Sequence, residues 1–281
     1  MIRTSARFLR DSLDATRHHR AMRLRNGFSA LLFCAVAACG TQAPTPDAAR
    51  AVVAANFGDA DPQDFPGRNP QSYPVQGIDA SRWQGTIDWP MAAASGVSFA
   101  YLKATEGGDG LDPTFATNWR GAAKAGIPRG AFHFFYWCRP AAEQARWFIR
   151  HVPRSAGALP PVLDLEWTPF SPTCTRRPDG AEVRAEALVF LNIVERHYGQ
   201  RPVIYTSPEI YRDAQLGRLT GYDFWLRSTA DRPSSIYPGQ AWTFWQYSGT
   251  GLVPGIRGKT DLNAFAGSKS DWSNWLATRA R

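Results

Sequence analysis

The chain has 281 residues, 44% of them hydrophobic, with 11 tryptophans and a formal net charge of +8 at pH 7. This composition excludes global disorder, and the length accommodates one large domain or two small ones. The charge does not indicate a nucleic-acid partner, because residues 1–39 hold seven arginines against two aspartates and leave a net charge of only +3 for the remainder.

Residues 1–38 have the pattern of an export signal. Several arginines precede a short apolar stretch from Phe28 to Ala38, and small residues precede Cys39. The apolar stretch is too short to cross a bilayer as a helix. The tetrapeptide VAAC resembles a bacterial lipobox, which predicts cleavage before Cys39 and lipidation of its thiol. An ordinary secretory signal cut near Cys39 is the alternative, and Met22 is an alternative start of the chain.

The segment after this cysteine predicts a tether between a membrane anchor and the folded domain. Residues 39–72 are rich in Ala, Pro, Asp, Gln and Asn, which is typical of a tether. A lipidated Cys39 would anchor the exported protein to a membrane. Gly40, in place of an aspartate after the cysteine, favours the periplasmic side of the outer membrane in an organism with two membranes. We expect the folded domain, a monomer, over residues 73–268 and a tail over 269–281.

Short apolar segments and helical segments alternate along this domain. The candidate strands are residues 75–80, 97–103, 129–136, 161–166, 202–206, 223–227, 242–247 and 260–265. The candidate helices are residues 88–95, 112–125, 140–151, 179–198 and 208–216. Strands that alternate with helices indicate parallel βα units. The last two gaps are rich in Pro, Gly and Ser and lack helical periodicity, so neither holds a full helix.

This order predicts a single-domain α/β fold, a TIM-like (β/α)5(β)3 barrel with helices after the first five strands only. Only about 195 residues are available, whereas a complete (β/α)8 barrel takes about 250. A doubly wound open sheet is the alternative, but the chain lacks a Gly-rich phosphate loop after the first strand. No sequence pattern indicates a metal site, and we expect no cofactor.

Two of the four cysteines remain for the folded domain. Cys34 lies in the leader, and Cys39 is the lipidation candidate. In an oxidising compartment Cys138 and Cys174 are predicted to form a disulfide, with two free thiols as the alternative.

Polar residues lie at the ends of the predicted strands that form the mouth of such a barrel, where barrel active sites are built. They are Asp79, Lys103, Glu106, Asp164, Glu166, Tyr205, Trp245, Gln246, Tyr247 and, at the start of the last strand, Asp261. Acids from four strands are therefore expected to meet at one mouth. Among the aromatic residues around it, Tyr136 and Trp245 are candidates for stacking on sugar rings.

Asp164 and Glu166 are two residues apart and face the same side of a strand, while Val162 and Leu165 are expected on its buried outer side. Two carboxylates this close cannot both ionise cheaply, so one pKa must rise. A protonated carboxyl beside an ionised one suits cleavage of a glycosidic bond. The alternative is an ion-paired barrel rim with Lys103 or Arg139 as the partner.

Six blocks carry a resemblance to glycoside hydrolase family 25, the Chalaropsis-type lysozymes. They are GIDASRWQGTIDW, VSFAYLKATEG, DPTFATNWRGAAKAGIPRGAFHFF, LPPVLDLEW, PVIYTSP and FWQYSGTGLVPGIRGKTDLNAF, within residues 73–267. The resemblance implies the (β/α)5(β)3 barrel and hydrolysis of the β-1,4 bond between N-acetylmuramic acid and N-acetylglucosamine in peptidoglycan glycan strands.

The resemblance also implies roles for the acids. Glu166 matches the general acid, and Asp164 matches the neighbouring carboxylate, a nucleophile or the stabiliser of a substrate-assisted intermediate. Asp79 and Asp261 match acids that bond the catalytic group or the sugar, and Glu106 matches a supporting acid. With Glu106, the candidate substrate-binding residues are Tyr136, Tyr205, Trp245 and Gln246.

The chain departs from the family pattern without losing a carboxylate. Phe132 stands where many members have tyrosine, and FWLRST at 224–229 replaces the usual LWIAxY. His133 is expected to be a core residue and not a base. A non-hydrolytic peptidoglycan-binding lipoprotein and a hydrolase of another hexosamine polymer are the competing functions.

Overall fold

The computed structural model describes residues 51–280, so the predicted signal peptide, Cys39 and residues 40–50 lie outside the described residues. Within 51–280 there is no helix whose length and apolar character would let it cross a bilayer.

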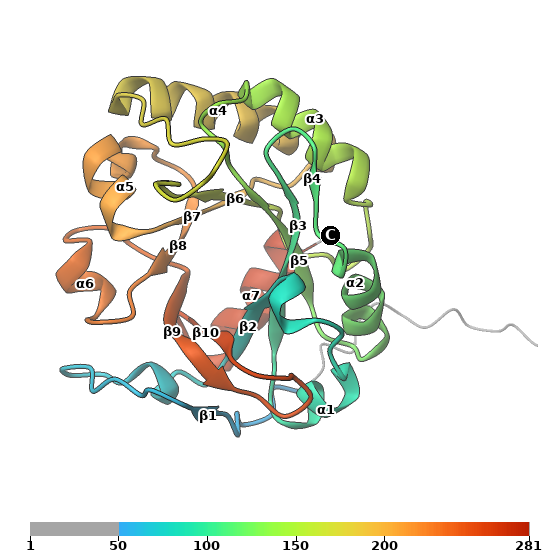
Figure 1. Cartoon of the computed structure of the whole chain (residues 1–281). Coiled ribbons are helices and arrows are strands. Elements are labelled where there is room, and N and C mark those ends of the chain that lie inside the picture. Colours follow the sequence, from blue (N-terminus) through green and yellow to red (C-terminus); the bar gives the residue numbers. More distant parts are fainter. Residues whose placement is uncertain (1–50, 281) are drawn as a thin grey trace, which may run out of the picture. The chain divides into compact units, whose positions relative to one another are not determined.

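Eight strands form a closed barrel, seen along its axis in Figure 1. They are β2 (Gln76–Ala80), β3 (Phe99–Glu106), β5 (Arg129–Phe134), β6 (Val162–Leu165), β7 (Val203–Thr206), β8 (Asp223–Arg227), β9 (Phe244–Leu252) and β10 (Thr260–Phe265). All neighbours from β2 to β9 pair in parallel, whereas β10 pairs antiparallel with both β9 and β2. The barrel mouth therefore gathers the carboxyl ends of seven strands and the first residues of β10.

Five helices follow the first five barrel strands and cover the outside of the barrel (Figure 1). They are α1 (Trp89–Ala94), α2 (Phe115–Lys124), α3 (Ala141–His151), α4 (Gly180–Tyr198) and α5 (Pro208–Ala214). The side chain of Asp179 caps the start of α4, and Gly199, at φ 66°, ends this helix in the left-handed conformation that glycine adopts readily. The gap after β8 holds only the one-turn α6 (Pro233–Ile236). The predicted fold class is confirmed.

Alternating side chains of the strands build two apolar layers. One layer fills the barrel and includes Phe99, Tyr101, Val162 and Phe244. The other packs between the strands and the helices and includes Leu163, Leu165, Trp245 and Tyr247. Val162 therefore shares the inward side of Asp164, and its predicted outer placement is wrong, because side chains two residues apart in a strand face the same way.

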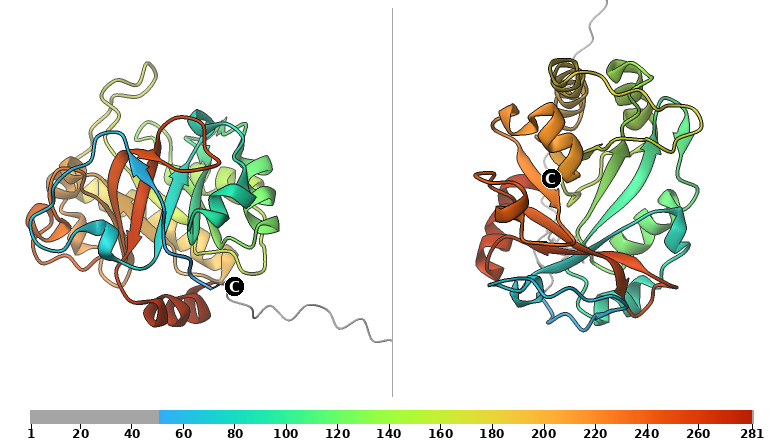
Figure 2. Two further views of the ribbon diagram at one scale, coloured as in Figure 1. Left: turned by 90° about the horizontal axis from the view of Figure 1, so that it is seen from below. Right: turned by 60° about the vertical axis from the view of Figure 1, so that its left-hand side comes forward.

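The predicted C-terminal tail is a folded part of the domain. Residues Lys269–Arg279 form α7, which begins with a capping box at Ser268 and Asp271. Its buried Trp272 packs against the interior rings of Phe99 and Phe265. Figure 2 shows α7 lying across one end of the barrel. The helix thus closes the end opposite the mouth.

Part of the predicted tether also packs on the barrel. The two-residue strand β1 (Gly58–Asp59) pairs with Leu252 and Gly251 of β9. The buried ring of Phe65 lies edge-on against Trp245, with 5.0 Å between ring centroids. The ordered domain therefore includes residues 51–72, and the expected start near residue 73 is corrected. The composition is that of a linker, but a few apolar and backbone contacts are enough to hold the segment.

Candidate active site

A cavity of about 270 Å³ opens at the barrel mouth. Its walls carry four carboxyls together with cationic, amide and aromatic side chains. The lining residues are Asp79, Ala80, Ser81, Trp83, Gln84, Lys103, Phe132, Asp164, Glu166, Tyr205, Trp225, Arg227, Gln246 and Asp261. The predicted catalytic acids therefore share one cavity, and they come from two strand ends, those of β2 and β6, and from the start of β10.

Asp79, on β2, is the most fully bonded of these acids. Its Oδ2 accepts hydrogen bonds from the amides of Gln246 at 2.9 Å and Asn263 at 2.8 Å. Burial raises the pKa of Asp79, whereas these amide donors and a hydrogen bond with Asp261 act in the opposite direction. Amide N–H groups are donors only, so the arrangement favours an ionised Asp79 that accepts every bond.

Asp261 lies directly across the strand pair from Asp79. Burial and the neighbouring charge of Asp79 raise the pKa of Asp261. Two carboxyls that bond to each other need one shared proton. Because Asp79 already accepts two amide bonds, the proton belongs to Asp261, which then donates to Asp79.

Asp164 and Glu166 form the second acidic pair. Burial is the main cause of a raised pKa for both carboxyls, and the charge of Glu166 adds to the effect on Asp164. Asp164 is the more deeply buried of the two, and its Oδ1 has no hydrogen-bond partner. Burial, the missing hydrogen-bond partner and the charge of Glu166 together favour a proton on Asp164. The sequence-based hypothesis, in contrast, is that Glu166, the general acid implied by the resemblance, holds the proton of the pair.

Two cations lower the pKa values of carboxyls in the cavity. Arg227, the last residue of β8, lowers the pKa of Glu166 and of Asp79 through its charge. Lys103 acts in the same direction on Asp164 but forms its ion pair with Glu106, at 2.5 Å. The alternative of an ion-paired rim fails here, since neither Asp164 nor Glu166 forms a salt bridge in the described part of the chain.

Tyr205 and Gln246 link the two acidic pairs. The phenol of Tyr205 donates to Gln246 Oε1 at 2.8 Å, and its oxygen lies 3.4 Å from Glu166 Oε1. The amide nitrogen of Gln246 in turn donates a hydrogen bond to Asp79. A continuous polar chain therefore runs from Glu166 to Asp79.

Not all predicted substrate-binding residues reach the cavity. Trp245 is only 1% exposed and packs in the outer layer, because Gln246 takes the inward position of β9; its predicted sugar contact is wrong. Glu106 is the last residue of β3 and Tyr136 follows the end of β5, but neither residue lines the cavity. Tyr136 lies edge-on against Phe134. The ammonium of Lys103 lies over the Phe134 ring, 4.7 Å from its centroid.

The sequence reasoning missed two residues of the site. Asn263 follows Asp261 at the i+2 spacing that puts both side chains on one face of β10, and this spacing could have identified it. Arg227 sits in the FWLRST segment, which was noted only as a departure from the family pattern. Trp83 lines the cavity with its side chain 77% exposed.

His133 is buried in the outer layer and takes no part in the cavity. Its ring bonds Thr105 at 2.7 Å and Gln144 at 3.0 Å. Burial lowers the pKa of His133 to about 3, so the ring stays neutral. The prediction of a core histidine is confirmed.

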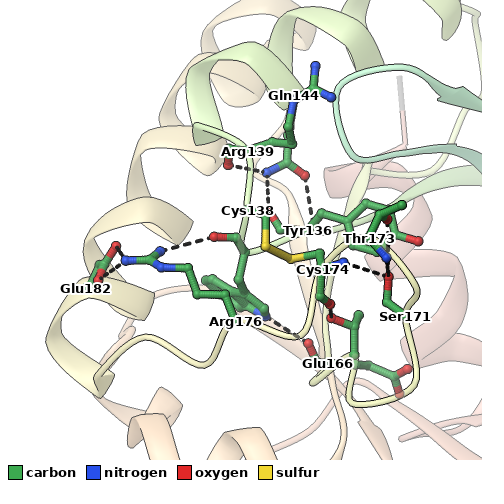
Figure 3. The surroundings of a disulfide bond; sticks show 12 residues. Tyr136, Cys138, Arg139, Gln144, Glu166, Ser171, Thr173, Cys174, Arg176 and Glu182 are labelled. Carbon is green, nitrogen blue, oxygen red and sulfur yellow. Dashed lines mark hydrogen bonds and ion pairs between the residues drawn. A yellow bond between two sulfur atoms is a disulfide. The ribbon is translucent and has the colours of Figure 1, made fainter.

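A disulfide supports the loop that carries Glu166 (Figure 3). It joins Cys138, after β5, to Cys174, in the loop after β6, over a Cα–Cα distance of 5.7 Å. Next to it, the indole of Trp137 donates to the backbone carbonyl of Glu166 at 2.9 Å. Arg176 donates to the carbonyl of Trp137 and forms a bidentate ion pair with Glu182 (Figure 3). The backbone of Glu166 is thereby fixed from outside the cavity.

The assembled site suits acid-assisted cleavage of a bond between two sugars. Such cleavage needs one carboxyl that keeps a proton near neutral pH and one carboxylate that stabilises positive charge. Burial of the Asp164–Glu166 pair supplies the first, and their proximity keeps one of them ionised while the other is protonated.

Comparison with known proteins agrees with this chemistry. Residues 78–256 match the family described as Glycosyl hydrolases family 25. The chain is 37% identical over 214 residues to Uncharacterized protein YegX of Escherichia coli O6:H1, covering 74% of this chain and 76% of the relative. It is 37% identical over 209 residues to Lysozyme M1 of Streptomyces globisporus, covering 69% and 68% of the two chains.

A solved structure shares the fold. The family 25 glycosyl hydrolase from Bacillus anthracis superposes with a TM-score of 0.65 at 34% identity, over 72% of this chain and 93% of that chain. The family match includes Asp79, Asp164 and Glu166. The chain therefore belongs to glycosyl hydrolase family 25 and is a glycoside hydrolase.

Proposed function

We propose that this protein is a muramidase, which hydrolyses the β-1,4 bond between N-acetylmuramic acid and N-acetylglucosamine in peptidoglycan. The observation that carries the proposal is the pair of carboxyls, Asp164 and Glu166, two residues apart at the end of β6 and both lining the mouth cavity. The similarity to Lysozyme M1 supports the choice of peptidoglycan as the substrate.

Glu166 is the proposed general acid. It follows the end of β6 and is half-buried, so it reaches the open part of the cavity, and position comes before pKa in selecting an acid. Its contact with Tyr205 supports this role. The phenol donates its hydrogen to Gln246 at 2.8 Å and lies 3.4 Å from Glu166 Oε1, so it fixes the position of this carboxyl.

Asp164 is the proposed partner carboxylate. Its unpartnered Oδ1 is a buried acceptor that a substrate N–H can satisfy, and the acetamido group of an N-acetylhexosamine carries such a donor. A hydrogen bond to the ionised form lowers a carboxyl pKa. Substrate binding would therefore ionise Asp164 and transfer the shared proton to Glu166, which gives it to the departing sugar oxygen.

The remaining groups position these two. Asp79, itself bonded to Asp261, holds Gln246, and through it Tyr205, in a fixed orientation. Trp83 offers an exposed ring to a sugar face beside the carboxyls. Export through residues 1–38 and a lipid on Cys39 would place the enzyme at a membrane in the compartment that contains peptidoglycan.

Incubation of the purified protein with peptidoglycan tests this function. We expect new reducing ends, and mass spectrometry should find muramic acid at each new end. N-acetylglucosamine at the new ends, or cleavage of chitin but not of peptidoglycan, would favour another hexosamine polymer. Binding to peptidoglycan without any release of reducing ends would contradict the enzymatic proposal.

A further inference from the structure

A second, strongly basic groove lies away from the active site. This groove has a volume of about 990 Å³ and lies between the ends of α2 and α3 and the segment after α3. Five of its lining residues are cationic: Arg120, Lys124, Arg129, Arg150 and Arg154, with His151 and His197 beside them. No aspartate or glutamate lines it. We call this set of residues the basic groove.

The cations of the basic groove are not neutralised by the fold. The ion pairs found within residues 51–280 include none of the five. Their contacts are with neutral groups instead: Arg129 donates to the carbonyl of Trp119 at 3.1 Å and lies over its ring, and Arg154 donates to the carbonyl of His197. Elsewhere arginines such as Arg139 and Arg176 have carboxylate partners. Mutual repulsion in such a cluster is relieved by binding an anion.

The position of the basic groove relative to the mouth is set by the topology. Arg129 is the first residue of β5, and Lys124 and Arg150 lie in the last turns of helices that run back from the mouth. The basic groove is therefore at the end of the barrel where strands begin. The first described residue, Ala51, packs at the same end, beside Ser98 and Pro128.

We infer that the basic groove binds the phosphate headgroups of an anionic phospholipid membrane. Arginine and lysine bind phosphate oxygens through charge-assisted hydrogen bonds, and a basic cluster held close to an anionic leaflet is attracted to it. If Cys39 carries the proposed lipid, only eleven residues separate it from Ala51, a reach of at most about 40 Å. The groove end of the barrel would then face the membrane, and the catalytic mouth would face away from it.

Vesicle binding tests the inference in the full chain carrying Cys39→Ala, so that no acyl chain contributes. The groove variant carries Lys124→Gln, Arg150→Gln and Arg154→Gln. The matched control carries Arg218→Gln, Arg257→Gln and Lys259→Gln, three exposed cations outside the groove. The leader is the same in every protein, so differences in binding report the substituted residues. Vesicles of phosphatidylcholine with one third phosphatidylglycerol are compared with vesicles of phosphatidylcholine alone.

We expect the groove variant to bind the anionic vesicles about 100-fold more weakly than the parent, since each cation near such a surface contributes about fivefold. The control should lose less than tenfold, added salt should weaken the parent's binding, and hydrolysis of soluble peptidoglycan fragments should be the same in all three proteins. Equal losses in both variants, or equal binding to the two kinds of vesicle, would overturn the inference. So would binding of the parent to soluble polyphosphate but not to vesicles. The hydrolysis assay keeps this result separate from the proposed function.

Discussion

The phenol of Tyr205 donates a 2.8 Å hydrogen bond to Gln246, and this bond connects the Asp164–Glu166 pair to the Asp79–Asp261 pair. Gln246 cannot turn its amide without losing its bond to Asp79. The orientation of Tyr205 beside Glu166 is therefore set by an acid on the opposite side of the barrel mouth.

Tyr205→Phe tests this connection. The ring should stay packed against Trp225, whose centroid is 4.7 Å away, while the polar chain is broken. We expect kcat to fall about 10- to 100-fold, because the acid loses its orienting contact. Tyr198→Phe, which removes a buried hydroxyl bonded to the Val152 carbonyl far from the mouth, is the control and should cost about 1 kcal/mol of stability without loss of kcat. Similar kcat losses in the two variants would show that the hydrogen bond from Tyr205 to Gln246 does not contribute to catalysis.

Asp164→Asn should make the protein more stable and inactive. Folding raises the pKa of Asp164, so the folded state binds this proton more tightly than the unfolded chain, and wild-type stability falls as pH rises from the unfolded pKa toward the folded one. A neutral amide removes this loss. We expect a gain of about 1–3 kcal/mol near neutral pH, or about 2–4 °C in Tm per kcal/mol, larger at pH 8 than at pH 5.

Calorimetry across this pH range measures the effect of Asp164→Asn. Asp112→Asn is the control, because that buried carboxylate accepts bonds from the backbone of Arg82 and from Thr114 and should lose stability when replaced. A lower Tm for Asp164→Asn at every pH would contradict the account of Asp164 as a buried acid with a raised pKa and an Oδ1 that lacks a hydrogen-bond partner.

Arg227→Gln should shift the pH dependence of catalysis. The charge of Arg227 lowers the pKa of Glu166, so its removal leaves Glu166 protonated to higher pH. The alkaline limb of kcat/KM should move up by about 0.5–1 pH unit. Arg212→Gln, an exposed arginine paired with Asp213, should leave the profile in place. A shift toward lower pH would mean that another group sets this limb.

The double variant Cys138→Ser/Cys174→Ser should lose both stability and activity. Opening a loop of 36 residues costs about 4 kcal/mol in the chain-entropy treatment. Activity should also fall when measured well below the new Tm, because Trp137 and the carbonyl of Glu166 lie beside the bridge. Trp137→Phe, which keeps the bridge but removes the indole donor, should reproduce the activity loss. Full activity in both variants would show that Glu166 is positioned without this support.

Much of the fold was predictable because its signals are local. The apolar strand segments, the helices between them and the missing helices near the C-terminus all follow from periodicity and from Pro and Gly content. The packing of residues 51–72 and of α7 was not predictable in this way. Phe65 and Trp272 gain their burial from partners that are distant in sequence, and neither lies in a strongly periodic segment.

The site was predictable to the extent that strand ends reveal it. The i and i+2 spacing placed Asp164 and Glu166 on one face, the strand ends identified Asp79 and Asp261, and the resemblance implied the roles of these acids. The same spacing rule separates Trp245 from Gln246, since adjacent residues of a strand face opposite sides. Depth of burial cannot be obtained from the spacing, and burial is the main cause of the raised pKa of both carboxyls.

The most direct test of the account is the activity of Glu166→Gln on peptidoglycan, measured as reducing ends released at the pH optimum of the wild type. Glu195→Gln, which alters a carboxylate paired with Arg201 outside the mouth, is the matched control. If Glu166 donates the proton to the departing sugar, kcat/KM should fall at least about 100-fold while Tm stays the same or rises. Activity within threefold of the control would contradict the role of Glu166 as the general acid.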